Sequence, residues 1–259
     1  MKFTGKTILI TGASSGLGKA FALRIAADKP HIILAARRVE KLKEVAAECN
    51  KQGASTNIVE LDVANPEAIK QVFANLAGSG KSLDLVFNNA GIGYVEPIYS
   101  MTPEKVQEMS DVNVRAMLLV TKYAADIMVQ QKSGHIIITS SVAGILPTPN
   151  WGVYSASKAA VISFADCIRP ELSPFGVQVT TLYPGAVKTE FFEAQKANLA
   201  LDKSPFAIGA DKVARLLYRA SFTRTDRLHV PTYIWAVNLL YRLFPAVLRF
   251  LVAKTGVSQ

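Results

Sequence analysis

Short apolar runs alternate with longer amphipathic stretches along most of this chain. The runs are rich in Ile, Leu and Val, lack regular polar alternation, and lie at residues 7–10, 31–35, 57–61, 83–87, 135–138 and 177–182. This pattern predicts strands that are covered on both faces. The stretches between them predict helices near 17–28, 38–52, 66–77, 103–131 and 152–173. A capping residue precedes a proline at Asn65-Pro66 and Thr102-Pro103, as expected where a helix begins.

The regular alternation of strand and helix indicates an α/β protein. Because crossovers between parallel strands are right-handed, the leading topology is a doubly wound parallel sheet of the Rossmann type, with about seven strands and helices on both faces. A length of 259 residues suits a single domain of this kind. We expect the domain to span residues 1–230, with a substrate lid near 186–207, and residues 231–259 to form a C-terminal apolar, basic helical extension.

A glycine-rich segment follows the first predicted strand. Residues 12–18 read Gly-Ala-Ser-Ser-Gly-Leu-Gly, with the spacing G-x-x-x-G-x-G. Such a turn from strand to helix lets backbone N–H groups approach a pyrophosphate, and the helix dipole favours the anion. The position of the segment favours a dinucleotide site over a tight turn without a ligand.

The same segment also matches a second motif. Gly12, Ser14 and Gly16 satisfy G-x-S-x-G, the nucleophile elbow of α/β-hydrolases. A serine hydrolase also needs an Asp or Glu and then a His, and His135 and His229 are the only histidines late in the chain. Neither has a recognisable setting, and an HGGG-type oxyanion loop is missing, so this is the weaker alternative.

The end of the second predicted strand bears on the choice of nucleotide. A carboxylate about 20 residues after the glycine loop usually holds the ribose 2′-hydroxyl. Here Ala36 stands at that position, and Arg37 and Arg38 follow. Without the carboxylate a 2′-phosphate is not repelled, and a guanidinium can pair with it bidentately. The sequence therefore predicts NADP(H) rather than NAD(H), with the alternative that one of the two arginines only begins a solvated helix.

Three polar clusters further along the chain are candidates for the reacting centre. Tyr154 and Lys158 are four residues apart, so they share one face of a predicted helix. A neighbouring ammonium lowers the pKa of a phenol and makes it a usable acid or base. Thr139, Ser140 and Ser141 stand at the end of the fifth predicted strand, where ligands bind in open α/β sheets. Asn113 lies in the predicted long helix and, taken alone, is a solvated polar residue.

Together these residues resemble the short-chain dehydrogenase/reductase family. The resemblance spans about residues 5–190 and rests on an ordered set: TGASSGLG (11–18), NNAG (88–91), Asn113, Ser141, Y-x-x-x-K (154–158) and Pro184-Gly185. It implies a catalytic tetrad of Asn113, Ser141, Tyr154 and Lys158. The family serine lies 13 residues before the tyrosine, which selects Ser141 over Ser140.

The resemblance also implies a mechanism. Nicotinamide supplies the hydride, Ser141 and Tyr154 hydrogen-bond the carbonyl oxygen, and Tyr154 donates the proton. Lys158 lowers the pKa of Tyr154 and holds the nicotinamide ribose, while Asn113 fixes a water in the proton path. The implied cofactor contacts are Gly12, Ser14, Ser15, Gly16, Leu17, Gly18, Arg37, Arg38, Asp62, Val63, Asn89, Ala90, Gly91, Tyr154, Lys158, Pro184, Gly185, Val187 and Thr189. A non-catalytic NADP-sensing protein on the same scaffold is the alternative, although a sensor needs no proton relay.

The segments expected around the substrate are mostly apolar. They supply Leu146, Trp151 and Phe191 as candidate substrate contacts beside Ser141 and Tyr154, and they hold no Arg cluster for a phosphate or dicarboxylate. We therefore expect a hydrophobic carbonyl or alcohol, similar to a lipid, a steroid or an aryl ketone. The alternative is that the phenylalanines of the lid, Phe191, Phe192 and Phe206, only pack the lid onto the domain.

The net charge of +9 suggests nucleic acid, an anionic membrane or an acidic partner. Residues 212–259 hold eight of the 29 Lys and Arg residues and one of the 20 Asp and Glu residues, so most of the excess belongs to the C-terminal part. The sequence has no zinc finger, RRM signature or basic aromatic stripe, which argues against nucleic acid. No metal site is expected either.

Residues 232–253 are apolar but are interrupted by Arg242, Pro245 and Arg249, so they are a poor membrane span. This extension can pack on the domain, form an oligomer interface, or lie on an anionic membrane through residues 231–254. The family resemblance implies a homodimer or homotetramer. Two distant cysteines and an N-terminus unlike a signal peptide predict a cytoplasmic enzyme, with peripheral membrane contact as the alternative.

Overall fold

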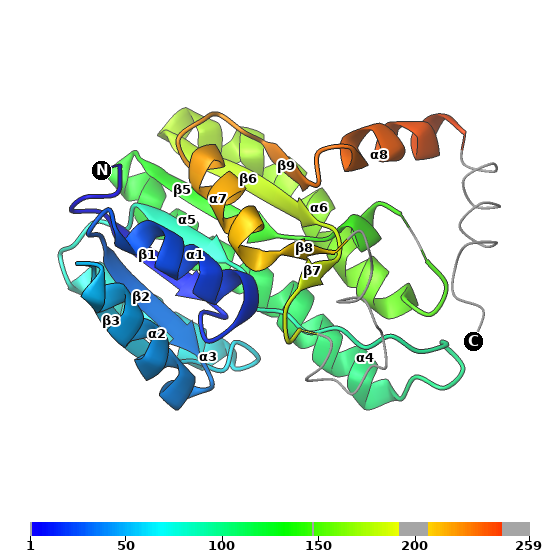
Figure 1. The fold of residues 1–259 in the computed structure, drawn as a ribbon, viewed down its shortest axis with the longest axis horizontal. Coiled ribbons are helices and arrows are strands. Elements are labelled where there is room, and N and C mark those ends of the chain that lie inside the picture. The colour runs from blue at the N-terminus through cyan, green and yellow to red at the C-terminus, as the bar shows by residue number, and fades with distance from the viewer. Residues whose placement is uncertain (1, 147, 192–206, 245–259) are drawn as a thin grey trace.

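A seven-stranded sheet forms the centre of the molecule (Figure 1). The structure is a computed structural model that describes residues 2–146, 148–191 and 207–244. The strands lie in the order β3–β2–β1–β4–β5–β6–β9, and all neighbours are parallel. Their bounds are β1 (Thr7–Thr11), β2 (His31–Ala36), β3 (Ser55–Glu60), β4 (Leu85–Asn88), β5 (Gly134–Thr139), β6 (Val177–Pro184) and β9 (Arg227–Val230). The predicted doubly wound α/β sheet of about seven strands is confirmed.

Helices cover both faces of this sheet, and each face has its own apolar core. One core lies under α1 (Gly16–Ala26), α2 (Val39–Lys51) and α7 (Ala210–Ala220). The other lies under α3 (Pro66–Gly78), α5 (Met117–Gln131) and α6 (Gly152–Leu172). Because side chains alternate along a strand, Ile8 and Ile10 of β1 enter the first core and Leu9 enters the second.

The helix that the sequence predicts over 103–131 has a break in its hydrogen-bond pattern. It begins as α4 (Pro103–Met109), continues as a π-helical turn (Ser110–Ala116) and then becomes α5. Thr102 caps its start, and Asn65 caps α3 by accepting from the N–H groups of Glu67 and Ala68 at 3.0 and 3.2 Å. The predicted helix starts are correct, whereas side-chain periodicity does not reveal the π turn, a rare feature that is frequently found at functional sites.

Two strands differ from the sequence-based expectation. β3 is an edge strand with four of its six residues exposed, so it is not covered on both faces as the apolar run suggested. β9 is absent from the predicted runs because it is short and contains Arg227 and His229. It nevertheless pairs with β6 and forms the other edge of the sheet.

The C-terminal part of the described chain leaves the sheet. β7 (Val187–Lys188) pairs with β8 (Ile208–Gly209), and the predicted lid between them falls mostly on 192–206, outside the described residues. Beyond β9, α8 (Ile234–Leu243) extends away from the sheet (Figure 1). Its neighbourhood exposes several large apolar side chains: Tyr233, Trp235, Leu239, Leu240, Leu243 and Phe244. In the ranges that the structure describes, which end at residue 244, no helix has the length and apolar character to cross a membrane.

Candidate active site

The glycine-rich segment forms a tight turn between β1 and α1. Gly12 and Gly16 have φ angles of +66° and +54°, where a side chain is strained. A Cβ atom on Gly18 would lie 2.3 Å from the carbonyl oxygen of Gly12, so only glycine lets the helix pack this closely on the turn. Ser15 is the N-cap residue of α1, but its side chain does not cap the helix. The first-turn N–H groups of α1 therefore suit an anionic ligand.

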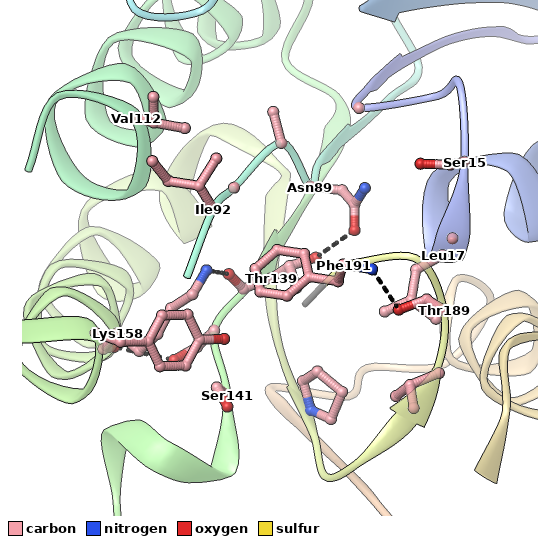
Figure 2. Close-up of a pocket in the computed structure, with 18 of the residues that line it drawn as sticks. Ser15, Leu17, Asn89, Ile92, Val112, Thr139, Ser141, Lys158, Thr189 and Phe191 are labelled. Atoms are coloured by element: carbon pink, nitrogen blue, oxygen red, sulfur yellow. Dashed lines mark hydrogen bonds between the residues drawn. The ribbon is translucent and has the colours of Figure 1, made fainter. Parts of the chain in front are cut away.

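Hydrogen bonds hold the segment after β4 against this turn. Thr11 Oγ1 accepts from the N–H groups of Asn89 and Ala90 at 2.9 and 3.1 Å. Thr139 Oγ1 donates to Asn89 Oδ1 at 3.3 Å (Figure 2). The ends of β1, β4 and β5 are thereby tied together. Thr11 belongs to the glycine motif, and Thr139 to the hydroxyl cluster after the fifth predicted strand, but their role in joining the strand ends was not predicted. A hydrogen bond between two distant strand ends leaves no signal in the sequence.

Arg38 lies across the glycine turn. Its Nη2 donates to Ser15 Oγ at 2.6 Å and to Ser14 Oγ at 3.2 Å, and its Nε donates to Ser14 Oγ at 3.3 Å. Arg37 is also exposed but makes none of these contacts. The structure therefore separates two arginines that the sequence left equivalent.

Ser141, Tyr154 and Lys158 meet at the carboxyl end of β5. Tyr154 and Lys158 are on α6 and are 5% and 2% exposed. Lys158 Nζ lies 5.7 Å from the centre of the Tyr154 ring and donates to the Thr139 carbonyl at 3.3 Å (Figure 2). Ser141 Oγ accepts from the N–H of Ala143 at 3.1 Å. Residues from one strand end and one helix thus form a compact cluster of a phenol, an ammonium and a hydroxyl.

Burial shifts the pKa values of both helix residues. It raises the pKa of Tyr154 to about 12, although a hydrogen bond with Ser141 acts in the lowering direction. It lowers the pKa of Lys158 to about 8. Burial has the largest effect on the pKa of Tyr154 in this structure, and the sequence-based expectation that Lys158 lowers that pKa stays a prediction. Tyr154 is therefore a protonated phenol at neutral pH.

Asn113 is completely buried in the π-helical turn. The interpretation of this residue in isolation, as a solvated polar side chain on a helix, is therefore wrong. Its Oδ1 accepts from the N–H of Ile92 at 2.9 Å, and its Nδ2 donates to the Ile92 carbonyl at 2.8 Å and to Ser157 Oγ at 3.1 Å. Ser157 Oγ in turn donates to the Tyr154 carbonyl at 2.7 Å. Asn113 therefore clamps the segment after β4 onto α6. Ser157 was not identified from the sequence.

These groups surround one cavity of about 680 Å³, which is within the usual range for small-molecule sites. All of the cofactor and substrate contacts expected from the sequence line this cavity, except Gly18. Gly18 packs against Gly12 behind the turn, and Asn113 lies behind the cavity wall. Glu190 also lines the cavity but was not expected there.

Aromatic side chains surround the hydroxyl cluster. The ring centres of Trp151 and Phe191 lie 5.6 and 6.2 Å from that of Tyr154. Leu146 and Ile92 line the same cavity, and Figure 2 shows Phe191 near the centre of the site. The remainder of the expected lid lies outside the described residues.

The geometry gives no support to the serine hydrolase alternative. Ser14 Oγ accepts from Arg38. His135 is at the amino end of β5, whereas the glycine turn follows the carboxyl end of β1, and His135 Nε2 lies 2.8 Å from Thr180 Oγ1. His229 stacks on Tyr183 with ring centres 4.5 Å apart. Neither histidine activates Ser14.

Several known proteins are similar to this chain in sequence and architecture. Residues 6–200 match the family described as short chain dehydrogenase. A 3-oxoacyl-[acyl-carrier-protein] reductase of Synechocystis sp. is 35% identical over 205 residues, which cover 79% of this chain and 83% of the relative. A short-chain dehydrogenase/reductase of Burkholderia phymatum in complex with NAD is 29% identical, with a TM-score of 0.85 and coverage of 94% and 95% of the two chains. A metagenomic short-chain oxidoreductase in complex with NADP is 25% identical, with a TM-score of 0.77 and coverage of 88% and 98%.

Proposed function

The chain belongs to the short-chain dehydrogenase family, and we propose that it is an oxidoreductase that transfers a hydride between NADP(H) and a carbonyl or secondary alcohol. The observation that carries this proposal is that Ser141, Tyr154 and Lys158 line the same cavity as the glycine turn. A cofactor at the turn and a substrate at the hydroxyls would meet there. The reductase among the relatives supports reduction of a carbonyl as the first direction to test.

The residues present fit a nicotinamide dinucleotide. The first turn of α1 has no side-chain cap and would bind the pyrophosphate. Asp62 and residues 89–91 would hold the adenosine, Lys158 the nicotinamide ribose, and residues 184–189 would flank the nicotinamide. When bound, the nicotinamide supplies the hydride for the carbonyl carbon.

Tyr154 and Ser141 would act on the substrate oxygen. The raised pKa of Tyr154 keeps the proton on Oη at neutral pH, where carbonyl reduction requires a donor. The two hydroxyl groups would stabilise the negative charge that develops on the substrate oxygen. Protonated Lys158 would stabilise the phenolate that remains after Tyr154 has given up its proton.

Lys158 and Asn113 would return a proton to Tyr154. With a pKa of about 8, Lys158 is able to give and take a proton near neutral pH. A Cβ atom on Gly91 would lie 3.2 Å from Asn113 Oδ1 and 3.4 Å from Lys158 Nζ, so the absence of a side chain there keeps these two groups accessible to each other. We propose that the Asn113 turn holds a water that connects Lys158 to solvent.

Tyr154→Phe tests the chemistry, with Tyr99→Phe as the control because Tyr99 is 89% exposed. We expect Tyr154→Phe to fold, to bind NADPH, and to lose about 10²–10⁴-fold in kcat for carbonyl reduction. Near-normal turnover by this variant would refute the proposed role. If the wild-type protein binds NADPH but oxidises it with no substrate in a broad carbonyl screen, the NADP-sensing alternative is favoured.

One similar structure contains NAD and another contains NADP, so similarity does not decide between the two cofactors. The proposed preference therefore rests on Ala36 and Arg38 of this chain. Arg38 is next to the serine hydroxyls of the glycine turn, and Ala36 brings no carboxylate against a 2′-phosphate. We expect a higher kcat/KM with NADPH than with NADH. Arg38→Ala should lower kcat/KM for NADPH by about 10- to 100-fold, as expected for a charge-assisted hydrogen bond, and should affect NADH much less. Equal or better use of NADH by the wild-type enzyme would contradict this preference.

We propose a hydrophobic substrate because Trp151, Phe191 and Leu146 line the cavity beside the hydroxyl cluster. Ketones related to lipids, steroids and aryl compounds should give higher kcat/KM than small keto acids. Preference for the keto acids would overturn this proposal.

The exposed apolar residues of α8 favour a contact beyond the domain over packing on it. We propose that the enzyme is a cytoplasmic homodimer or homotetramer and that residues 231–259 contribute to the interface. Removal of residues 232–259 should then lower the molecular mass measured by sedimentation. An unchanged assembly, together with salt-sensitive pelleting of the full chain with anionic liposomes, would support the membrane alternative instead.

A further inference from the structure

Three charged side chains meet at the edge of the glycine turn. Glu190 Oε2 lies 3.3 Å from Arg38 Nη1 and 3.0 Å from Lys41 Nζ, and Glu190 Oε1 lies 3.3 Å from Lys41 Nζ. Arg38 is the N-cap residue of α2, Lys41 is in its first turn, and Glu190 follows β7. The carboxylate comes from a segment 149 residues beyond Lys41 and joins two cations at the cofactor cavity.

We infer that Glu190 is an internal competitor for the 2′-phosphate of the cofactor and that Lys41 is a second cation that binds this phosphate. The inference rests on the proposed NADP(H) preference. Arg38 already contacts the hydroxyls of Ser14 and Ser15, which fixes its guanidinium beside the glycine turn. A phosphate that binds there needs the same donors that Glu190 now uses.

The charges at this site make the competition direct. A phosphate monoester carries a charge of about −1.5 to −2 near pH 7. Arg38 and Lys41 together match that charge, whereas Glu190 neutralises one of them. The hydrogen bond from Lys41, with further contributions from Arg38, lowers the pKa of Glu190, so the competing carboxylate stays ionised at neutral pH. A phosphate bound to Arg38 and Lys41 would also be repelled by the nearby Glu190 carboxylate, since both groups are negatively charged.

The carboxylate is held only weakly, so a phosphate is able to displace it. The side chains of Arg38, Lys41 and Glu190 are 45%, 41% and 51% exposed. Ion pairs with this exposure stabilise a protein by about 0–1 kcal/mol. Because the cations must leave Glu190 before they bind phosphate, the apparent affinity for phosphate is the intrinsic affinity multiplied by the fraction of molecules in which the cations are released. We therefore expect a modest effect of about two- to fivefold on binding.

The position of Glu190 next to Phe191 requires a probe that does not reach the catalytic cluster. Phe191 contacts the ring of Tyr154, so a change at Glu190 could alter turnover without any effect on the phosphate. Adenosine 2′,5′-bisphosphate carries the 2′-phosphate but no nicotinamide. Adenosine 5′-monophosphate lacks the 2′-phosphate and serves as the reference ligand.

The test measures the dissociation constants of both nucleotides by calorimetry for the wild-type protein, Glu190→Gln, Lys41→Gln and Glu40→Gln. Glu40 is a matched control, since it is on the same helix and pairs with Lys43 rather than with Arg38 or Lys41. Glu190→Gln should bind the bisphosphate about two- to fivefold more tightly with no change for the monophosphate. Lys41→Gln should bind the bisphosphate more weakly, and Glu40→Gln should resemble the wild type.

Two results would overturn the inference while the NADP(H) preference stands. In the first, the wild type prefers the bisphosphate but Glu190→Gln binds it no more tightly. In the second, Glu190→Gln or Glu40→Gln tightens binding of both nucleotides equally, which would indicate only a general charge effect. If the wild type does not prefer the bisphosphate at all, the proposed NADP(H) preference fails and this inference fails with it.

Discussion

Lys158→Met should make the cofactor-free protein more stable at pH 7 although it removes a residue of the proposed active site. Lys158 is 2% exposed, and its burial lowers the pKa from 10.5 to about 8. A buried ammonium is therefore a cost to folding at neutral pH. Methionine has a similar length and carries no charge, so it would remove this cost.

The size of the effect follows from linkage. Each pKa unit is worth about 1.4 kcal/mol, so a fall of this size costs about 3 kcal/mol. Because the pKa is lower in the folded state, the cost is complete below pH 8 and disappears as the pH rises towards 10.5. The Thr139 carbonyl would lose the hydrogen bond from Lys158 Nζ, which subtracts about 1 kcal/mol. The net gain at pH 7 is about 2 kcal/mol.

Urea denaturation of the wild type, Lys158→Met and Lys51→Met at pH 7 and pH 9.5 measures this gain. We expect Lys158→Met to be about 2 kcal/mol more stable than the wild type at pH 7 and less than about 1 kcal/mol more stable at pH 9.5. Lys51 is exposed in the last turn of α2, so its variant should stay within about 0.5 kcal/mol of the wild type at both pH values. A Lys158→Met protein that is less stable than the wild type at pH 7, or a gain that does not depend on pH, would refute the reasoning.

Three further variants test other parts of the site. Asn113→Ala leaves the buried N–H and carbonyl of Ile92 without their partner. It should therefore lower the free energy of unfolding, measured in urea, by about 2–5 kcal/mol. A loss below about 0.5 kcal/mol would contradict the proposed clamp. Gly18→Ala brings a Cβ atom to within 2.3 Å of the Gly12 carbonyl oxygen. The variant should therefore bind NADPH more weakly in a fluorescence titration. Unchanged binding would show that the turn adjusts at no cost. Ser141→Ala removes one of the two hydroxyl groups proposed to hydrogen-bond the substrate oxygen. It should lower kcat by about 10²–10³-fold with an unchanged Kd for NADPH. A loss in kcat of less than about tenfold would argue against that contact.

The sequence by itself determined the sheet, most helix starts and the positions of the candidate site residues. These features are local or follow a regular order along the chain. The apolar runs become β1, β2 and β4–β6, and the capping residues at 65 and 102 begin α3 and α4. Glycine spacing depends on backbone angles within a single turn, so residues 12–18 are recognisable before the structure is known.

Only the tertiary structure decided which polar residues act together. It distinguished Arg38 from Arg37, buried Asn113 in a π turn against Ile92, and left Tyr154 and Lys158 only 5% and 2% exposed. It also joined Glu190 to Lys41 across 149 residues of chain. Hydrogen bonds between distant segments and the loss of water around a side chain arise only when the helices pack on the sheet, so no pattern along the sequence records them.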